Sequence, residues 1–130
     1  MTMMGRVSAE FYLIREQAEM QCRMYQQAIN DINQAIEMDP SNAGYWAEKG
    51  GIHLRLNRLE EAIQALEKAL TLNPDEASTY RMLGYAELQH GKKKEGLAHL
   101  QKASEMGDTV AGELIEKSMA KLSWNLHWKV

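Results

Sequence analysis

The sequence repeats itself at an interval of 34 residues, and this periodicity limits the possible fold more than any other feature. Pro74 follows Pro40 by that interval, and Gly84 follows Gly50. Three further sets of like residues keep the same spacing: Ala28 and Ala62; Ala35, Ala69 and Ala103; Tyr12, Trp46 and Tyr80. Matched residue types at a fixed interval of this length indicate stacked copies of one structural unit.

The best-preserved copy, residues 46–74, shows what the unit is. Its second half has apolar residues at steps of three and four, which gathers them on one stripe of a helix: Leu59, Ala62, Ile63, Leu66, Ala69 and Leu70. The first half is apolar at helical spacing around Trp46, Gly50 and Leu54, and a short turn at Asn57 joins the halves. The sequence therefore predicts a helix–turn–helix unit that buries its stripe against neighbouring copies.

The matched residues resemble the pattern of the tetratricopeptide repeat family. That pattern runs from an aromatic residue through Leu-Gly to a small residue opening the second helix, then to alanine and a closing proline. It is carried here by Trp46, Gly50, Ala62, Ala69 and Pro74, and again by Tyr80, Leu83, Gly84 and Ala103. The resemblance implies an all-α fold, a right-handed helical-repeat solenoid of three helix–turn–helix units plus a seventh, capping helix.

The resemblance also divides the chain. We expect a flexible lead over residues 1–8, a repeat domain over about 9–122, and a tail over 123–130. The three copies are expected at about 9–42, 43–76 and 77–108, and the capping helix at about 109–122. A terminal helix with a polar outer face is needed because stacked repeats leave their last stripe bare. That polar face is expected from Glu113, Glu116, Lys117 and Lys121.

The first copy is the least regular of the three. We expect it to form two helices, over about 8–22 and 25–38. Glu16 stands where the second copy has Gly50, so this helix pair is either splayed or turns the glutamate outward. Arg23 occupies the inner-turn position that asparagine and glycine hold in the other copies, which indicates a different turn.

The tail is compatible with two regular structures. Trp124, Leu126, Trp128 and Val130 alternate with polar residues as in a strand, whereas Leu122 and Leu126 also continue a helical spacing. Two tryptophans are costly to leave in water because each has a large apolar area. We expect them to fold back on the repeat stack or, alternatively, to dock on another copy or fill the groove; a disordered end is the third alternative.

Composition excludes several classes of protein. A net charge of −3 argues against a dedicated nucleic-acid binder, which would show a basic stripe. Cys22 is the single cysteine, so no internal disulfide can form, as is typical of a reducing compartment. No apolar run is long enough to span a membrane, and the first residues do not form a signal peptide. We therefore expect a cytoplasmic protein, unless the chain is a fragment of a longer or exported one.

Candidate chemistry is sparse. None of the four histidines is spaced i, i+4 with another, and no cysteine or glutamate completes a zinc site, so we predict no metal and no cofactor. The run Lys92–Lys93–Lys94 is expected to be a solvated helix start rather than a phosphate site. Cys22 has no suitable base near it in sequence. Nothing in the sequence indicates an enzyme or a catalytic residue.

The resemblance implies a concave groove lined by the first helix of each pair. Carried over residue by residue, its lining is Leu13, Gln17, Met20, Ala47, Gly51, Leu54, Arg55, Arg81, Tyr85 and Leu88, flanked by Glu10, Gln21, Gly44, Ser78 and Gln89. Leu54, Tyr85 and Leu88 would contact a short peptide, and Arg55 and Arg81 would hold a carboxylate. Chaperone-binding members use Lys and Asn at set places, which here hold Leu13, Gln17, Glu48, Ser78 and Met82.

These features predict a module that binds a peptide segment of another protein in its concave groove, as an adaptor or an assembly or chaperone-like factor. The missing Lys and Asn residues argue against binding of heat-shock chaperone tails. In size the chain resembles the small three-repeat chaperones of bacterial secretion systems. The alternative is a self-associating structural module, in which the tail residues Trp124, Leu126 and Trp128 form the contact between copies.

Overall fold

The computed structural model describes the backbone of residues 3–129 and the side chains of residues 17–19 and 21–121. This part of the chain forms six helices and contains no strand. The helices are α1 (Met3–Met38), α2 (Ala43–Arg55), α3 (Leu59–Leu72), α4 (Ala77–Gln89), α5 (Lys93–Glu105) and α6 (Thr109–Lys129). The predicted all-α class is confirmed.

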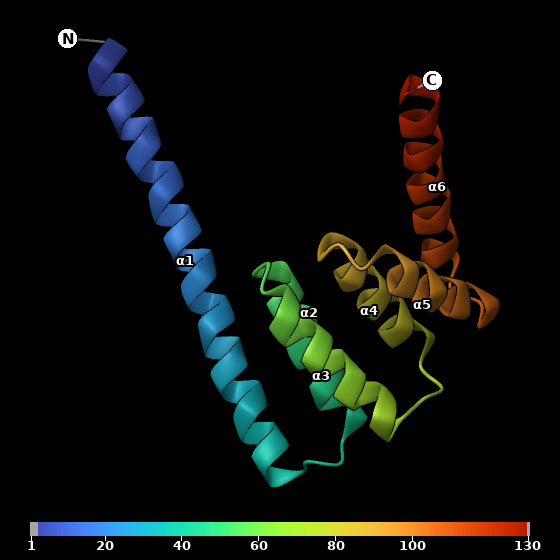
Figure 1. Cartoon of the computed structure of the whole chain (residues 1–130). Helices are drawn as coiled ribbons and strands as arrows, with labels where there is room; N and C mark the ends of the chain where they lie inside the picture. Colours follow the sequence, from blue (N-terminus) through green and yellow to red (C-terminus); the bar gives the residue numbers. More distant parts are fainter. Residues whose placement is uncertain (1–2, 130) are drawn as a thin grey trace.

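Each helix packs against the next one along the chain. In addition, α2 contacts α4 and α4 contacts α6. Figure 1 shows α2 with α3, and α4 with α5, as two successive helix pairs, with α1 on one side of them and α6 on the other. This arrangement is the predicted helical-repeat solenoid.

Close approach of the two helices at a glycine sets the packing within each pair. A Cβ atom at Gly50 of α2 would lie 2.6 Å from Cγ of Leu66 in α3. In the next pair a Cβ at Gly84 would lie 2.7 Å from the carbonyl oxygen of Gly96, and one at Gly96 would lie 2.8 Å from that of Gly84. The glycines that repeat at 34-residue intervals are therefore crossing points where only a hydrogen fits.

Left-handed residues make the inner turns. Asn57 between α2 and α3 has φ 58°, and Gly91 between α4 and α5 has φ 90°. Gly107 ends α5 with φ 104°, and Asp108 then caps α6 by accepting a hydrogen bond from the Ala111 amide at 2.9 Å. Glycine reaches this conformation without steric cost, and asparagine tolerates it.

The first copy differs from the prediction, because α1 is one helix of 36 residues instead of a helix pair. The helix count is therefore six and not seven. Arginine at position 23 does not readily adopt the left-handed backbone of the inner turn. The side chain of a glutamate at position 16 does not fit a helix crossing that requires glycine. No glycine or proline stands between residues 6 and 38 to interrupt the helix.

The second half of α1 still packs as the second helix of a repeat. Ile29, Ile32 and Ile36 form a buried cluster with Ile52 of α2. Ala28, however, is only half-buried, although the equivalent Ala62 is 0% exposed. The difference arises because the first half of α1 continues as a straight rod instead of folding back over that face (Figure 1).

At the other end of the chain α6 runs past the predicted end at residue 122. Its backbone is helical to Lys129, so the tail takes the helical alternative and not the strand. Residues 3–8, expected as a flexible lead, likewise belong to α1. The side chains of the tail tryptophans lie outside the described residues.

His53 is a buried titratable group in α2. It is 6% exposed, and its Nδ1 atom has no hydrogen-bond partner within the described residues. Burial is the main cause that lowers the pKa of His53; Glu61 opposes this shift, and Lys49 and Arg58 add to it. Protonation therefore favours the unfolded chain.

Replacing Gly84 by alanine should destabilise the fold although alanine is the better helix former. The added Cβ meets backbone atoms of α5, which cannot move cheaply, so we expect a net loss of about 1–2 kcal/mol in the free energy of unfolding. Gly112→Ala in α6 is the matched control, because its Cβ would have Ser104 Oγ at an ordinary 3.6 Å. Urea unfolding should show it unchanged or more stable by up to about 1 kcal/mol. Equal effects of the two substitutions would contradict the packing argument.

Restoring the missing turn and crossing residues should fold α1 back on itself. Nitroxide labels at Gln17→Cys and Gln34→Cys, in a Cys22→Ser background, should lie about 26 Å apart along a continuous helix. Adding Glu16→Gly and Arg23→Gly should shorten this distance toward the roughly 10 Å spacing of packed helices. Double electron–electron resonance measures the long distance, and dipolar broadening of the continuous-wave spectrum detects the short one. A long distance that persists in the variant would show that other residues hold the helix continuous.

Stability should fall as the pH drops below about 6.5, where His53 takes up a proton in the unfolded chain before it does so in the folded one. At higher pH the imidazole is neutral in both states and contributes no pH dependence. Chemical unfolding of the wild type and of His53→Leu between pH 7.5 and 5 separates this effect from that of other groups. The variant should lose less stability over that interval, and parallel curves would exclude His53 as the cause.

Candidate functional site

The inner faces of α2 and α4 bring the predicted groove positions of the second and third copies together. Ala47 and Arg81, Gly51 and Tyr85, and Leu54 and Leu88 are each 34 residues apart, and the two helices touch. Equivalent positions on successive first helices of a stack point to the same side of it. Six of the ten predicted lining residues thus share one face.

Gly51 leaves the middle of this face open. Among the described side chains, a Cβ atom there would meet only the sulfur of Met82, at an ordinary 3.7 Å. Its neighbour Gly50 points instead into the tight crossing with α3. Two adjacent glycines therefore have different roles, one as a packing residue and one as unfilled space on the inner surface.

Apolar contacts on this face differ in exposure. Tyr85 is 41% exposed, which is high for a large apolar side chain beside a core. Leu54 and Leu88 are half-buried and pack on the core clusters around Leu66 and Leu100. The leucines form a floor, and the tyrosine is the side chain most available to a ligand.

The two arginines have different surroundings. Arg81 is paired with Asp108, with 3.4 Å between Nη1 and Oδ2, so its guanidinium joins α4 to the start of α6. This ion pair occupies part of the guanidinium that we expected to hold a ligand carboxylate, and the expected role of Arg81 stays a prediction. Arg55 is exposed and forms no ion pair within the described part of the chain.

The remaining predicted residues lie elsewhere. Gln17 is exposed on the first half of α1, and Figure 1 shows this half extending beyond the α2–α3 pair. The side chains of Leu13 and Met20, and those of the tail residues Trp124, Leu126 and Trp128, are outside the described residues. The continuous α1 therefore does not form a first groove helix beside α2.

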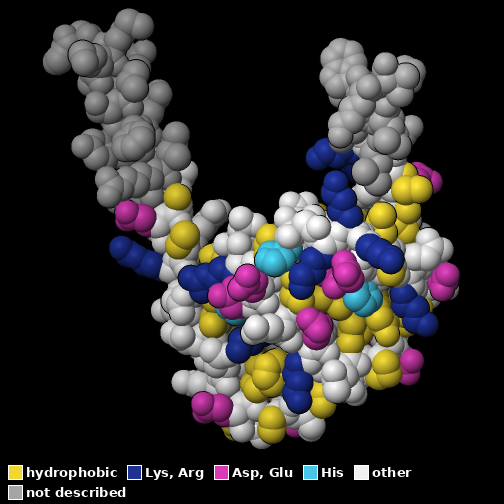
Figure 2. Space-filling view, viewed as in Figure 1, with side chains coloured by type: hydrophobic (Ala, Val, Ile, Leu, Met, Phe, Trp, Pro, Cys, Tyr) yellow, Lys and Arg dark blue, Asp and Glu magenta, His cyan; other side chains and the backbone are white. Residues whose placement is uncertain are grey.

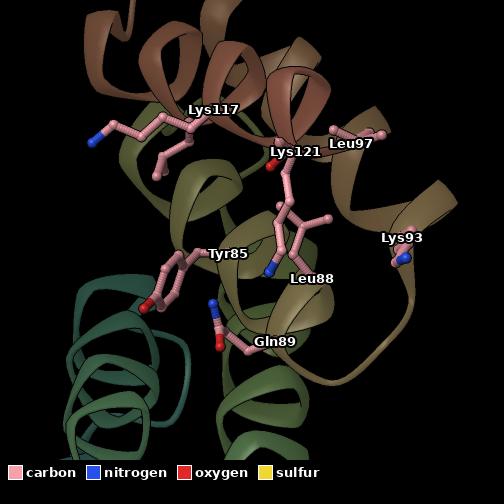
Figure 3. A pocket seen from close by; sticks show the side chains of 9 residues that line it. Tyr85, Leu88, Gln89, Lys93, Leu97, Lys117 and Lys121 are labelled. Atoms are coloured by element: carbon pink, nitrogen blue, oxygen red, sulfur yellow. The ribbon is translucent and has the colours of Figure 1, made fainter. Parts of the chain in front are cut away.

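A cavity of about 280 Å³ lies at the other end of the inner face, between α4, α5 and α6. Figure 3 shows Tyr85, Leu88 and Gln89 on its α4 side, and Lys121 extending from α6 toward Leu88. Its remaining lining is Lys93, Leu97, Leu114, Lys117 and Ser118.

The sequence did not reveal that the three lysines line this cavity. We assigned Lys117 and Lys121 to the polar outer face of the capping helix, and Lys93 to a solvated helix start. The signal was the spacing of Leu114, Lys117 and Lys121, which are three and four residues apart and so share one face of a helix. The basic side chains visible on α6 in Figure 2 stand where it leaves the body of the stack.

Other kinds of site leave no trace in the described residues. No three His, Cys, Asp or Glu side chains gather there as a metal ion would require. Within the same part of the chain, no helix combines the length and the apolar character needed to cross a bilayer. Basic and acidic side chains are interspersed over the face seen in Figure 2.

Known structures share this architecture. The chain is similar to a tetratricopeptide repeat domain of OM64 from Arabidopsis, with 21% identity, a TM-score of 0.70, and coverage of 78% of this chain and 85% of that one. It is also similar to the first such domain of RPAP3 bound to an HSP90 peptide, with 19% identity, a TM-score of 0.73, and coverage of 82% and 86%. At these identities the likeness shows the fold.

MamA of AMB-1 is more similar in sequence, at 30% identity with a TM-score of 0.61. The match covers 66% of this chain and 51% of that one, so the chain spans about half the length of that MamA chain. No curated protein matches the chain in sequence.

A family model described as tetratricopeptide repeat matches residues 17–77, which include the second half of α1 and the whole α2–α3 pair. The tetratricopeptide repeat fold is a scaffold for interactions between proteins. The periodicity, the glycine crossings and these matches agree, and the chain belongs to the tetratricopeptide repeat family.

Proposed function

We propose that this protein binds a peptide segment of a partner protein along the inner faces of α2 and α4. The observations that support this most directly are the lack of a side chain at Gly51 of α2 and the exposed ring of Tyr85 at the equivalent position of α4. Tyrosine is enriched at interfaces between proteins because it joins a large apolar ring to a hydroxyl that can form a hydrogen bond. A related repeat domain is known bound to a peptide.

The chemistry of the face indicates what it would hold. Leu54 and Leu88 supply an apolar floor, and Tyr85 offers both a ring face and a hydroxyl. Arg55 stands exposed at one edge and is suited to a carboxylate, because its guanidinium can donate two hydrogen bonds in parallel. An extended or helical segment with an apolar side chain and an acidic neighbour fits this arrangement.

The same face argues against one ligand of the wider family. Glu48, Ser78 and Met82 stand where chaperone-binding members place Lys and Asn, so heat-shock chaperone tails are not the expected ligand. The role we propose is that of an adaptor or assembly factor, which holds one partner segment while other surfaces stay free.

Filling the open space should abolish binding without harming the fold. Peptides selected from a random library on the wild-type protein provide the ligand. Gly51→Gln should weaken their binding at least tenfold, because the new side chain occupies the groove. The substitution should not destabilise α2, because glutamine is a better helix former than glycine by up to about 1 kcal/mol. Thr71→Gln on the exposed face of α3 is the control and should change nothing. Fluorescence anisotropy gives the affinities, and thermal unfolding verifies the fold. Unaltered affinity in Gly51→Gln would exclude the inner face as the binding site.

A further inference from the structure

The cavity between α4, α5 and α6 has a fixed base. The side chain of Asp108 is 10% exposed and binds both Arg81 of α4 and the Ala111 amide of α6. Ala111 itself is fully buried against Leu100 and Ala103 of α5. The first turn of α6 is thus clamped to both helices of the last pair, and this holds the cavity walls in position.

The walls combine apolar and basic groups. Leu88, Leu97 and Leu114 each come from a different helix and form the apolar part. Lys93 enters from α5, and Lys117 and Lys121 stand one helical turn apart on α6. No aspartate or glutamate lines the cavity, and none of the three lysines is ion-paired within the described residues. Among the described residues no ion pair offsets this positive charge, although the net charge of the protein is −3.

Size separates the possible ligands. Small-molecule and cofactor sites occupy roughly 300–1,000 Å³, and this cavity measures about 280 Å³. The cavity thus lies at the lower limit of that range, and it has room for a few side chains of a longer ligand. The apolar wall, moreover, would be left exposed by phosphate alone.

We propose that this cavity binds an acidic segment of the partner, seating one apolar side chain against the leucines and placing neighbouring carboxylates on Lys93, Lys117 and Lys121. The proposal rests on the proposed function, since the cavity shares Tyr85, Leu88 and Gln89 with the inner face. It adds the chemical class of the partner segment and extends the site onto α6. Residues 123–130 of the chain contain no aspartate or glutamate, so this tail lacks the acidic groups of the occupant, which we assign to another protein.

Three synthetic peptides test the chemistry. The first has a central leucine flanked on each side by two aspartates or glutamates; the second replaces every acidic residue by its amide; the third replaces the leucine by serine. Full-length protein should bind the first peptide, and each of the other two should bind at least tenfold more weakly. Raising the salt concentration from 0.15 to 0.5 M should weaken binding of the first peptide, because the lysines are exposed to solvent.

Charge reversal locates the site. Lys117→Glu with Lys121→Glu should weaken binding of the acidic peptide about tenfold or more. Lys68→Glu with Lys102→Glu changes the net charge equally, away from the cavity, and should have a much smaller effect. Circular dichroism should show unchanged helicity in both variants.

Other outcomes would overturn the assignment. Equal loss in both double variants would mean attraction by net charge only. Binding of inorganic phosphate or of anionic lipid vesicles that depends on Lys117 and Lys121, without binding of the acidic peptide, would replace the peptide by another anion.

If library-selected peptides lose affinity in Gly51→Gln but not in the Lys117/Lys121 variant, the proposed function stands and the cavity assignment fails. If no selected peptide responds to Gly51→Gln while the acidic peptide requires the two lysines, the cavity stands and the inner-face site fails.

Discussion

Contact between backbones at the helix crossings is the constraint on which this structure depends. Where Gly84 faces Gly96, each missing Cβ leaves just enough room for the carbonyl oxygen of the other helix. The resulting short separation between α4 and α5 brings Leu83 and Leu100 into the core, where both are almost fully buried. At this separation α6 packs against both helices. A wider crossing would move the walls of the cavity and the inner face together.

Much of this could be predicted from the sequence, because crossings and turns need particular residue types. Gly50, Gly84 and the alanines of the second helices stand at crossings, and Asn57 and Gly91 stand at left-handed turns. The first copy was predicted wrongly for the same reason. Its aromatic, alanine and proline positions fit the repeat, but Glu16 and Arg23 do not meet the steric requirements of a crossing and a turn. A glutamate at the crossing and an arginine at the turn both disfavour a helix pair, so these two residues predict the single long helix.

The functional surfaces were less predictable. Positions on the inner face of α2 and α4 followed from the repeat, since equivalent residues must share a side of the stack. The pairing of Arg81 with Asp108 did not, because Asp108 replaces a proline and belongs to the next helix. Lys117 and Lys121 look like solvated surface in sequence, where a lysine beside a cavity and a lysine facing bulk water have the same pattern. Their role depends on where α6 lies relative to α4, and this is a tertiary property.

The continuous α1 has a consequence for cooperativity. In a linear array each unit is stabilised by its own packing and by its interfaces with its nearest neighbours. The second half of α1 has one such interface, with α2, and the helix that would complete its own unit does not fold onto it. The α4–α5 pair, in contrast, is covered on both sides, by α3 and by α6. We therefore expect the array to open from its terminal helices and the α4–α5 pair to be the last part to unfold.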